Sequence, residues 1–171
     1  MTVQFEIEDT VRFSQCDPAG IVFFPQYLVM LNTLHERWFN EGLGVPYHEY
    51  IGVRRLGLPT VRLECDFTAV SRHGDRLRQR LAVSRLGRSS VELAVEFSGE
   101  DELRARFRQV LVCTSLVTHK ALALPDDVRQ GMQRYLKGKM DDARARIEAQ
   151  VNEKIDAQRK QLHARQGEIE S

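Results

Sequence analysis

The sequence predicts an α+β protein in which one long helix packs against a single antiparallel sheet. Five segments alternate between apolar and polar residues, as half-buried strands do. One segment near the N-terminus instead repeats apolar residues at helical spacing. Because a helix and a sheet that each have one apolar face must bury those faces together, a two-layer sandwich follows.

The first predicted strand covers residues 3–13 and ends at a turn. Its apolar side chains alternate with polar ones such as Gln4 and Glu6. Proline and glycine together mark a turn, so we expect the strand to stop at the segment Asp17-Pro18-Ala19-Gly20.

The helix is predicted from about Pro25 to Asn40. Proline suits the first helical turn, where its missing N–H costs nothing, and Gly42 and Gly44 are candidate terminators. The apolar stripe of this helix consists of Tyr27, Met30, Leu31, Leu34 and Trp38.

Four further strands are predicted over residues 61–67, 77–83, 91–97 and 103–113. In the last one the alternation changes parity near Gln109, which indicates a bulge or a strand that becomes buried on both faces. Three glycine-containing segments are expected to form hairpin connections: Gly74-Asp75, Gly87-Arg88 and Gly99-Glu100-Asp101.

Residues 1–125 are thus predicted to form one domain, and 126–171 a charged helical extension. A short helix is expected from Asp126 to Lys137. Beyond it, a weak heptad-like seam favours a solvated charged helix, with partner-dependent coiling as the alternative. The seam consists of Met140, Ile147, Val151, Ile155 and Leu162.

Composition argues against several classes of protein. The formal net charge of +1 gives no general reason to expect nucleic acid or an anionic membrane as a partner. No apolar window is long enough to span a bilayer, and no signal peptide is evident. The 3 cysteines and 5 histidines lack the spacing of a disulfide framework or a metal site. We therefore expect a cytoplasmic protein without a metal ion.

The turn around Asp17 combines the groups that an acyl-transfer enzyme requires. Asp17 stands at a strand end, Gly20 relaxes the backbone, and the first helical turn offers free N–H groups near Phe23 and Phe24. A carboxylate beside donors for a developing oxyanion is suited to cleavage of an ester or thioester. From the spacing alone, an ordinary Asp-Pro turn explains the pattern better.

The segment from Arg12 to Tyr27, which contains Asp-Pro-Ala-Gly-Ile-Val, two phenylalanines, Pro25 and Tyr27, resembles the active-site segment of the 4-hydroxybenzoyl-CoA thioesterase family. The resemblance implies the hotdog fold, in which an antiparallel sheet wraps one long helix, over roughly residues 1–125. It also implies hydrolysis of an acyl-CoA, with an aromatic acyl group as one possibility, without a cofactor other than the coenzyme A of the substrate. A homodimer or tetramer is implied as well.

Carried over by residue, the resemblance makes Asp17 the nucleophile or general base and the Phe24 N–H the donor to the thioester carbonyl. Gly20 permits close approach of the substrate. The acyl pocket is implied to be lined by Val22, Phe23 and Tyr27.

Further positions of the site follow from the same resemblance. Asn32 stands where the aromatic-substrate branch has an acid that holds the ring hydroxyl, and this weakens the case for the 4-hydroxybenzoyl group. Pro59 and Thr60 are implied to reach the substrate across the dimer. The turn that holds Arg85, Arg88 and Ser89 is a candidate grip for the CoA phosphates, with a solvated hairpin as the alternative and Arg54, Arg55 and Arg72 as other candidates.

Rival functions remain open on the sequence. A non-catalytic acyl-CoA-binding protein would share the fold. A short-chain thioesterase is disfavoured, because that branch has a histidine where this chain has Pro25, and a dehydratase would need a histidine on the Asp17 segment. Cys16 is read as a small apolar filler and His35 as a core histidine satisfied by a hydrogen bond.

Overall fold

The computed structural model describes residues 3–136. The described residues belong to one compact unit, which runs to Leu136, and residues 137–171 lie outside the described part. The heptad-like seam predicted from Met140 to Leu162 therefore lies outside the described residues. No helix in the described part is long and apolar enough to cross a membrane.

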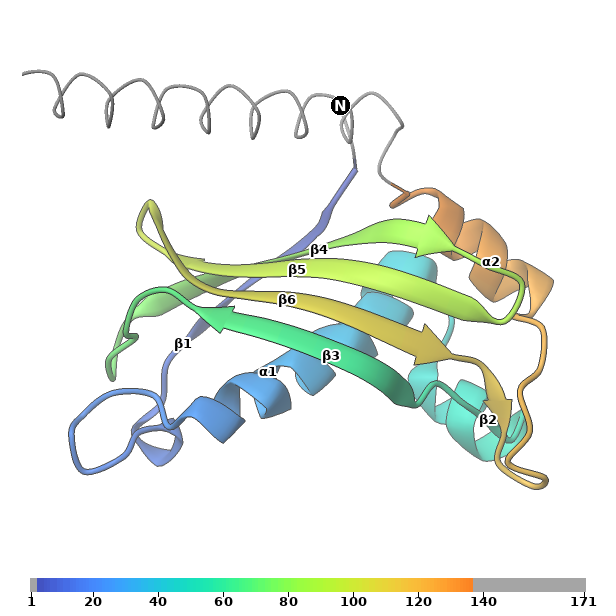
Figure 1. The fold of residues 1–171 in the computed structure, drawn as a ribbon, viewed down its shortest axis with the longest axis horizontal. Coiled ribbons are helices and arrows are strands. Elements are labelled where there is room, and N and C mark those ends of the chain that lie inside the picture. The colour runs from blue at the N-terminus through green and yellow to red at the C-terminus, as the bar shows by residue number, and fades with distance from the viewer. Residues whose placement is uncertain (1–2, 137–171) are drawn as a thin grey trace, which may run out of the picture. The chain divides into compact units, whose positions relative to one another are not determined.

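This compact unit is a five-stranded antiparallel sheet with one long helix on a single face (Figure 1). The strand order is β1-β4-β5-β6-β3, and the helix α1 spans Phe24–Arg37. This confirms the predicted two-layer α+β architecture. The strands are β1 (Phe5–Thr10), β3 (Thr60–Phe67), β4 (Arg76–Leu86), β5 (Ser90–Gly99) and β6 (Glu102–Val112).

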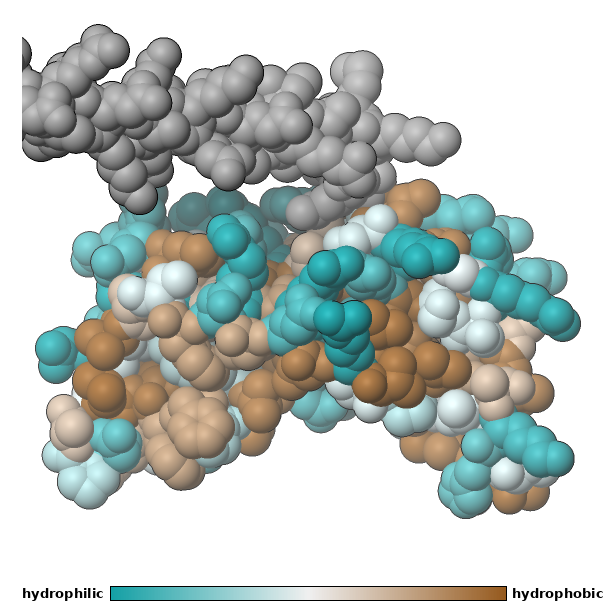
Figure 2. Space-filling view, viewed as in Figure 1, coloured by the Kyte–Doolittle hydropathy of each residue, from teal (hydrophilic) through white to brown (hydrophobic). Residues whose placement is uncertain are grey.

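Alternation along the strands separates an apolar inner face from a charged outer face. In β5 every second residue from Val91 to Phe97 is fully buried, and Figure 2 shows hydrophilic residues interspersed with apolar ones on the face toward the viewer. On the outer face of the sheet, acidic side chains of β5 pair with basic ones of β6, as Glu96 does with Arg106. Exposed pairs of this kind contribute little to stability, so burial of the inner face holds the layers together.

The first strand is shorter than predicted. β1 ends at Thr10, and Phe13–Gln15 form a turn of 3-10 helix. Phe13 is 80% exposed, although its position in the alternating pattern predicts a buried side chain. The chain has already left the sheet to reach the loop that precedes α1.

The long helical segment continues beyond the end of the α-helix α1. After Arg37 the chain continues as a wider π-helical segment, Trp38–Leu43, and ends at Gly44 with a left-handed φ of 71°. Gly44 is thus the predicted terminator. Gly42 lies inside the helical segment, where an added Cβ would come within 2.6 Å of the Trp38 side chain.

Of the two interpretations of the parity change near Gln109, a bulge of β6 at this residue is wrong. The pairing between β5 and β6 runs without a shift through Leu93–Gln109 and its neighbours, and the Gln109 side chain is buried on the inner face at 5% exposure. The irregularity lies in the neighbouring strand instead, between Thr60 and Arg62 of β3. Gln109 is a polar residue at an inward position, which the apolar pattern cannot register.

Two of the three predicted hairpins are present. Gly87 lies between β4 and β5, and Gly99 lies at the β5–β6 connection. Gly74-Asp75 is not a hairpin, because β3 pairs with β6 and β4 pairs with β1. The short strands β2 (Leu56–Gly57) and β7 (Thr114–Ser115), which pair with each other, and a π-helical turn at Glu49–Val53 were not predicted.

The short helix α2 (Asp126–Gln133) is present, and its apolar side packs within the compact unit. Val128 and Met132 are fully buried, and the Val83 N–H of β4 donates to the Tyr135 carbonyl at 2.9 Å. The compact unit therefore runs to Leu136, beyond the domain end predicted at position 125.

Candidate active site

The Asp17 loop is a tight hairpin closed by its own backbone. Cys16 and Val22 form an antiparallel bridge, and the Asp17 N–H donates to the Ile21 carbonyl at 2.9 Å. Gly20 takes a left-handed φ of 76° and donates to the Asp17 carbonyl at 2.9 Å. The Ala19 N–H donates to Asp17 Oδ1 at 2.8 Å. These contacts hold the half-buried carboxylate in one position and occupy one of its oxygens.

Backbone contacts of its second strand attach this hairpin to the rest of the domain. The Val22 N–H donates to the Ser71 carbonyl at 2.8 Å, and Ile21 bridges Arg72. The Tyr27 hydroxyl donates to Ser71 Oγ at 2.8 Å in the interior, and burial raises the Tyr27 pKa. Tyr27 therefore stays a neutral phenol that ties α1 to the segment under the loop.

The loop leads directly into the N-terminus of α1. Phe23 is the N-cap residue and makes no side-chain cap, and Pro25 occupies the first turn. As the first helical residue, Phe24 has an N–H without an acceptor inside the helix, at the positive end of the helix dipole. Phe23 and Phe24 are 49% and 58% exposed, so the helix start carries an accessible apolar surface.

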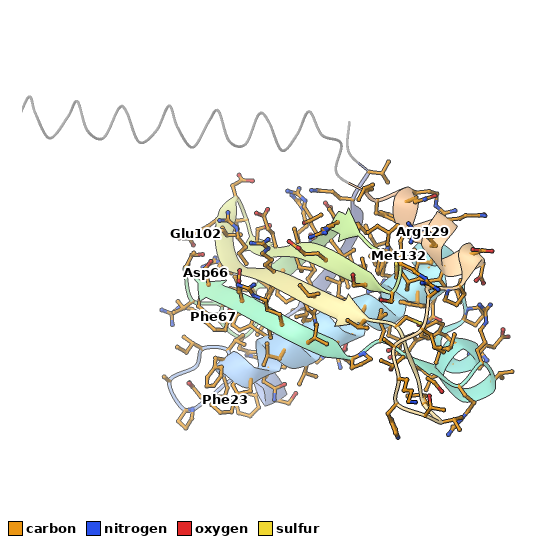
Figure 3. All side chains as sticks on the ribbon, turned by 45° about the vertical axis from the view of Figure 1, so that its right-hand side comes forward. Phe23, Asp66, Phe67, Glu102, Arg129 and Met132 are labelled. Atoms are coloured by element: carbon orange, nitrogen blue, oxygen red, sulfur yellow. The ribbon has the colours of Figure 1, made fainter. Side chains whose placement is uncertain are left out.

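This apolar surface continues onto the edge strand β3. The rings of Phe24 and Phe67 lie 6.3 Å apart, and Figure 3 shows Phe23 and Phe67 at the same end of the molecule. Val61 and Leu63 are also exposed on β3, which has a neighbour on one side only in the described sheet. Exposed apolar edge strands are ready to pair with another chain.

A cavity of about 200 Å³ lies between α1 and the start of β3. Its lining includes Asn32 and Thr60, which were predicted as site residues. It also includes His35 and Gln109, which were not assigned to the site. His35 is buried, and this lowers its pKa to about 4. Its Nε2 has no hydrogen-bond partner in the described structure, contrary to the satisfied core histidine that was expected. Apolar side chains complete the wall.

Other predicted residues lie apart from this cavity. Asp17, Gly20, Val22, Phe23 and Tyr27 do not line it. Val22 and Tyr27 are buried in the core. Tyr27 packs against the rings of Phe67 and Phe97. Within one chain, the Asp17 loop and the Asn32 cavity are separate.

The predicted CoA-binding turn, which joins β4 to β5, lies at the opposite end of the sheet from the loop that leads into α1 (Figure 1). β4 runs from Arg76, opposite Thr10, to Leu86, and its 11 residues span about 36 Å at about 3.3 Å each. The turn adjoins Thr60 instead, because the Cys113 N–H donates to the Ser89 carbonyl and the Val112 N–H donates to the Pro59 carbonyl. Arg129 of α2, which contacts Gly87, marks this end in Figure 3.

Comparison with known proteins identifies the family of this chain. Residues 11–132 match the family model of the thioesterase-like superfamily. A 1,4-dihydroxy-2-naphthoyl-CoA hydrolase of Synechocystis sp. is 31% identical over 124 residues, which cover 71% of this chain and 88% of that protein. The corresponding hydrolase of Synechococcus elongatus is 25% identical over 130 residues, 75% of this chain and 95% of the relative.

Solved structures agree with the sequence relatives. The crystal structure of a 1,4-dihydroxy-2-naphthoyl-CoA thioesterase from Synechocystis superposes with a TM-score of 0.71 and 28% identity, covering 77% of this chain and 96% of that one. A gentisyl-coenzyme A thioesterase gives a TM-score of 0.68 and 26% identity, with 75% and 99% covered. The chain therefore has the hotdog fold and belongs to the thioesterase-like superfamily.

Proposed function

We propose that the protein hydrolyses the thioester of an aromatic acyl-CoA, with Asp17 as the catalytic carboxylate. The superfamily and the hydrolases related to this chain make it an acyl-CoA thioester hydrolase. The observation that carries the assignment is the Asp17 carboxylate, held by Ala19 on a hairpin that leads straight into the uncapped start of α1.

The chemistry follows from these two features. The Phe24 N–H polarises the thioester carbonyl, where negative charge develops in the transition state. Asp17 either bonds to the acyl carbon as the C–S bond breaks, giving an anhydride that water opens, or takes a proton from the attacking water. Both routes consume one water and release CoA and the free carboxylic acid. Neither route requires a metal ion or a further cofactor.

The proposed active unit is a homodimer in which two β3 strands pair antiparallel about a twofold axis at Glu64. Opposite residues of antiparallel strands share a face. This register therefore sets Leu63 against the partner's Cys65 on the helix side and Arg62 against the partner's Asp66 on the charged side. Apolar meets apolar and opposite charges meet, so the exposed side chains of β3 support this pairing.

The same symmetry supplies the residues that a single chain keeps apart. The Thr60 end of one β3 comes to the Phe67 end of the other, next to Phe24 and the Asp17 loop. Pro59 and Thr60 of one protomer thus reach the partner's substrate. The turn with Arg85, Arg88 and Ser89 adjoins Thr60, so in this dimer it serves the CoA of the partner's site.

The Asp17→Asn variant tests the assignment. Asparagine keeps the side-chain oxygen that accepts from Ala19 but loses the nucleophile and base. We expect kcat/KM on a panel of aromatic and aliphatic acyl-CoAs to fall at least about 100-fold, about 2.7 kcal/mol of barrier. Asp101→Asn, in the exposed β5–β6 turn, is the matched control and should keep full activity.

Two results would contradict the proposal. Equal rates for wild type and Asp17→Asn would remove the role of the carboxylate. Tight binding of acyl-CoAs without turnover by the wild type would favour a non-catalytic acyl-CoA-binding protein.

A further inference from the structure

The connection between β3 and β4 contains a tight turn that the chemistry proposed above does not use. It comprises residues 71–75 and is called the 71–75 turn below. Asp75 Oδ2 accepts from the Arg72 N–H at 2.8 Å, and the Asp75 N–H donates to the Arg72 carbonyl at 3.0 Å. An aspartate that bonds nearby backbone in this way fixes the conformation of a turn. The Asp75 carboxylate therefore sets the shape of this one.

The segment that contains Asp17 starts from the 71–75 turn. Just after β1, the Val11 N–H donates to the Asp75 carbonyl at 2.8 Å, and the Gly74 N–H donates to the Val11 carbonyl at 3.0 Å. Val11 is only 1% exposed, so water has little access to these bonds. They fix the first end of the segment.

The same segment returns to the 71–75 turn at its other end. The Val22 N–H donates to the Ser71 carbonyl at 2.8 Å. Ser71 is 1% exposed, and its Oγ accepts from the Tyr27 hydroxyl at 2.8 Å, so the turn is attached to α1 as well. Residues 12–21, which include Asp17, thus begin and end on one turn that is also tied to the helix.

This arrangement makes the position of Asp17 depend on the shape of the turn. Phe24, whose N–H is the proposed donor to the thioester carbonyl, belongs to α1, whereas Asp17 belongs to the segment that the turn holds. Without the Asp75 oxygen the Arg72 N–H would lose its acceptor and the two attachment points would move relative to each other. A shift of about 1 Å between reacting groups can cost about 100-fold in rate.

We propose that Asp75 and Ser71 are positioning residues for the reaction. Asp75 keeps the turn in the shape that aligns the Asp17 carboxylate with the Phe24 N–H, and Ser71 fixes the turn to α1. Both act through Asp17 and not through contact with the substrate. The inference rests on the proposed role of Asp17 and adds the side chains that hold it in place.

Two substitutions at Asp75 separate the hydrogen bond from the charge. Asp75→Asn keeps a side-chain oxygen that accepts from the Arg72 N–H, whereas Asp75→Ala removes it. We expect kcat of Asp75→Ala on aromatic acyl-CoAs to fall about 10-fold or more, with KM little changed, because the carboxylate is misplaced while the substrate still binds. Asp75→Asn should restore most of the lost activity.

A serine in another turn provides the matched control. Ser115 Oγ accepts from the N–H groups of Val117 and Thr118 at 3.1 Å each. Ser115→Ala therefore also removes a side-chain acceptor from turn backbone, but in the turn after β7. It should keep the wild-type kcat.

A double-mutant cycle with Asp17→Asn tests whether Asp75 acts through Asp17. In that background the carboxylate is already missing, so Asp75→Ala should cause little further loss of kcat. A residue that only stabilises the fold would lower the rate by the same factor in both backgrounds. Circular dichroism at the assay temperature confirms that each variant is folded.

Ser71→Ala provides a second route, which also serves if Asp75→Ala does not fold. It removes the acceptor of the Tyr27 hydroxyl and loosens the turn from α1. The same cycle should again give a loss of kcat when Asp17 is present and little further loss in Asp17→Asn.

The outcomes separate this inference from the proposed function. Unchanged kcat in Asp75→Ala, or equal losses with and without Asp17, would overturn the positioning role and leave the proposed hydrolysis intact. A loss in Asp75→Asn as large as that in Asp75→Ala would also overturn it, since the charge and not the hydrogen bond would then be needed. Wild-type rates for Asp17→Asn would instead remove the proposed role of Asp17, and with it the residue that Asp75 is inferred to position.

Discussion

Burial determines the charge state of His35, and this has a consequence for stability. The side chain lies between α1 and the sheet, and the loss of solvation lowers its pKa from 6.5 to about 4. The unfolded chain therefore binds a proton between these two values that the folded chain does not bind. Stability that is present above pH 6.5 is lost as the pH falls toward 4.

The size of this loss follows from the shift, which corresponds to about 3 kcal/mol when complete. We expect the free energy of unfolding of wild type, measured with urea between pH 7 and 4.5, to fall more steeply than that of His35→Leu. His48→Leu removes an exposed histidine and should follow the wild-type slope. Parallel slopes for all three proteins would show that His35 is protonated in the folded state as readily as in the unfolded one.

The functional residues could be predicted where a sequence motif groups them together. They could not be predicted where only burial in the fold gives a residue its role. Asp17, Gly20 and Phe24 form one continuous segment, and the structure puts them on one hairpin and the helix that follows. Gln109 has no such signal. A glutamine in a strand resembles an outward residue, and only its burial and its register opposite Leu93 show that it points inward.

At the level of elements, the end of the long helical segment depends on one backbone conformation. Gly44 adopts a left-handed φ of 71°, and its N–H donates to the Phe39 carbonyl. An added Cβ would meet no atom within 4 Å, so any effect of a side chain at this position comes from backbone strain alone. Left-handed geometry costs an L-residue about 1 kcal/mol or more.

Alanine substitutions at two glycines separate the effect of this backbone strain from the effect of adding a methyl group. Gly44→Ala should lower the free energy of unfolding by about 1 kcal/mol. Gly52, in the π-helical turn Glu49–Val53, is equally open but lacks a positive φ, so Gly52→Ala should leave stability unchanged or raise it by up to about 1 kcal/mol. Urea denaturation followed by circular dichroism measures both. The same loss in both variants would argue against strain at Gly44.

The elements whose residues alternate or repeat regularly were all predicted: the helix and the five strands, to within a few residues. The exceptions are segments that are too short to show a period, that change their helical geometry, or that keep the period without being buried. The π-helical continuation at Trp38–Leu43 follows the apolar spacing of α1 with a wider turn, and the short strands β2 and β7 have two residues each. The end of β1 was misplaced because Phe13 continues the alternation while exposed.

At the level of the whole molecule, the periodicity of the sequence predicts neither the order of the strands in the sheet nor pairing with a second copy of the chain. Gly74-Asp75 resembled a hairpin, yet β3 crosses to the far edge of the sheet and leaves its outer side unpaired. Apolar residues gather along this margin (Figure 2). The unpaired edge is what makes a shared site possible, with Asp17 from one chain and Thr60 from the other.

Mixed dimers test the shared site directly. Asp17→Asn removes the carboxylate, and Thr60→Trp fills the cavity at an exposed position, so each homodimer should be nearly inactive. In a mixed dimer, one of the two sites combines the intact Asp17 of one chain with the intact Thr60 of the other. Coexpression in equal amounts should therefore restore about one quarter of wild-type activity, because half of the dimers are mixed and each has one complete site. If each site lay within one chain, every site would keep a defect and the mixture would show only the sum of its parents.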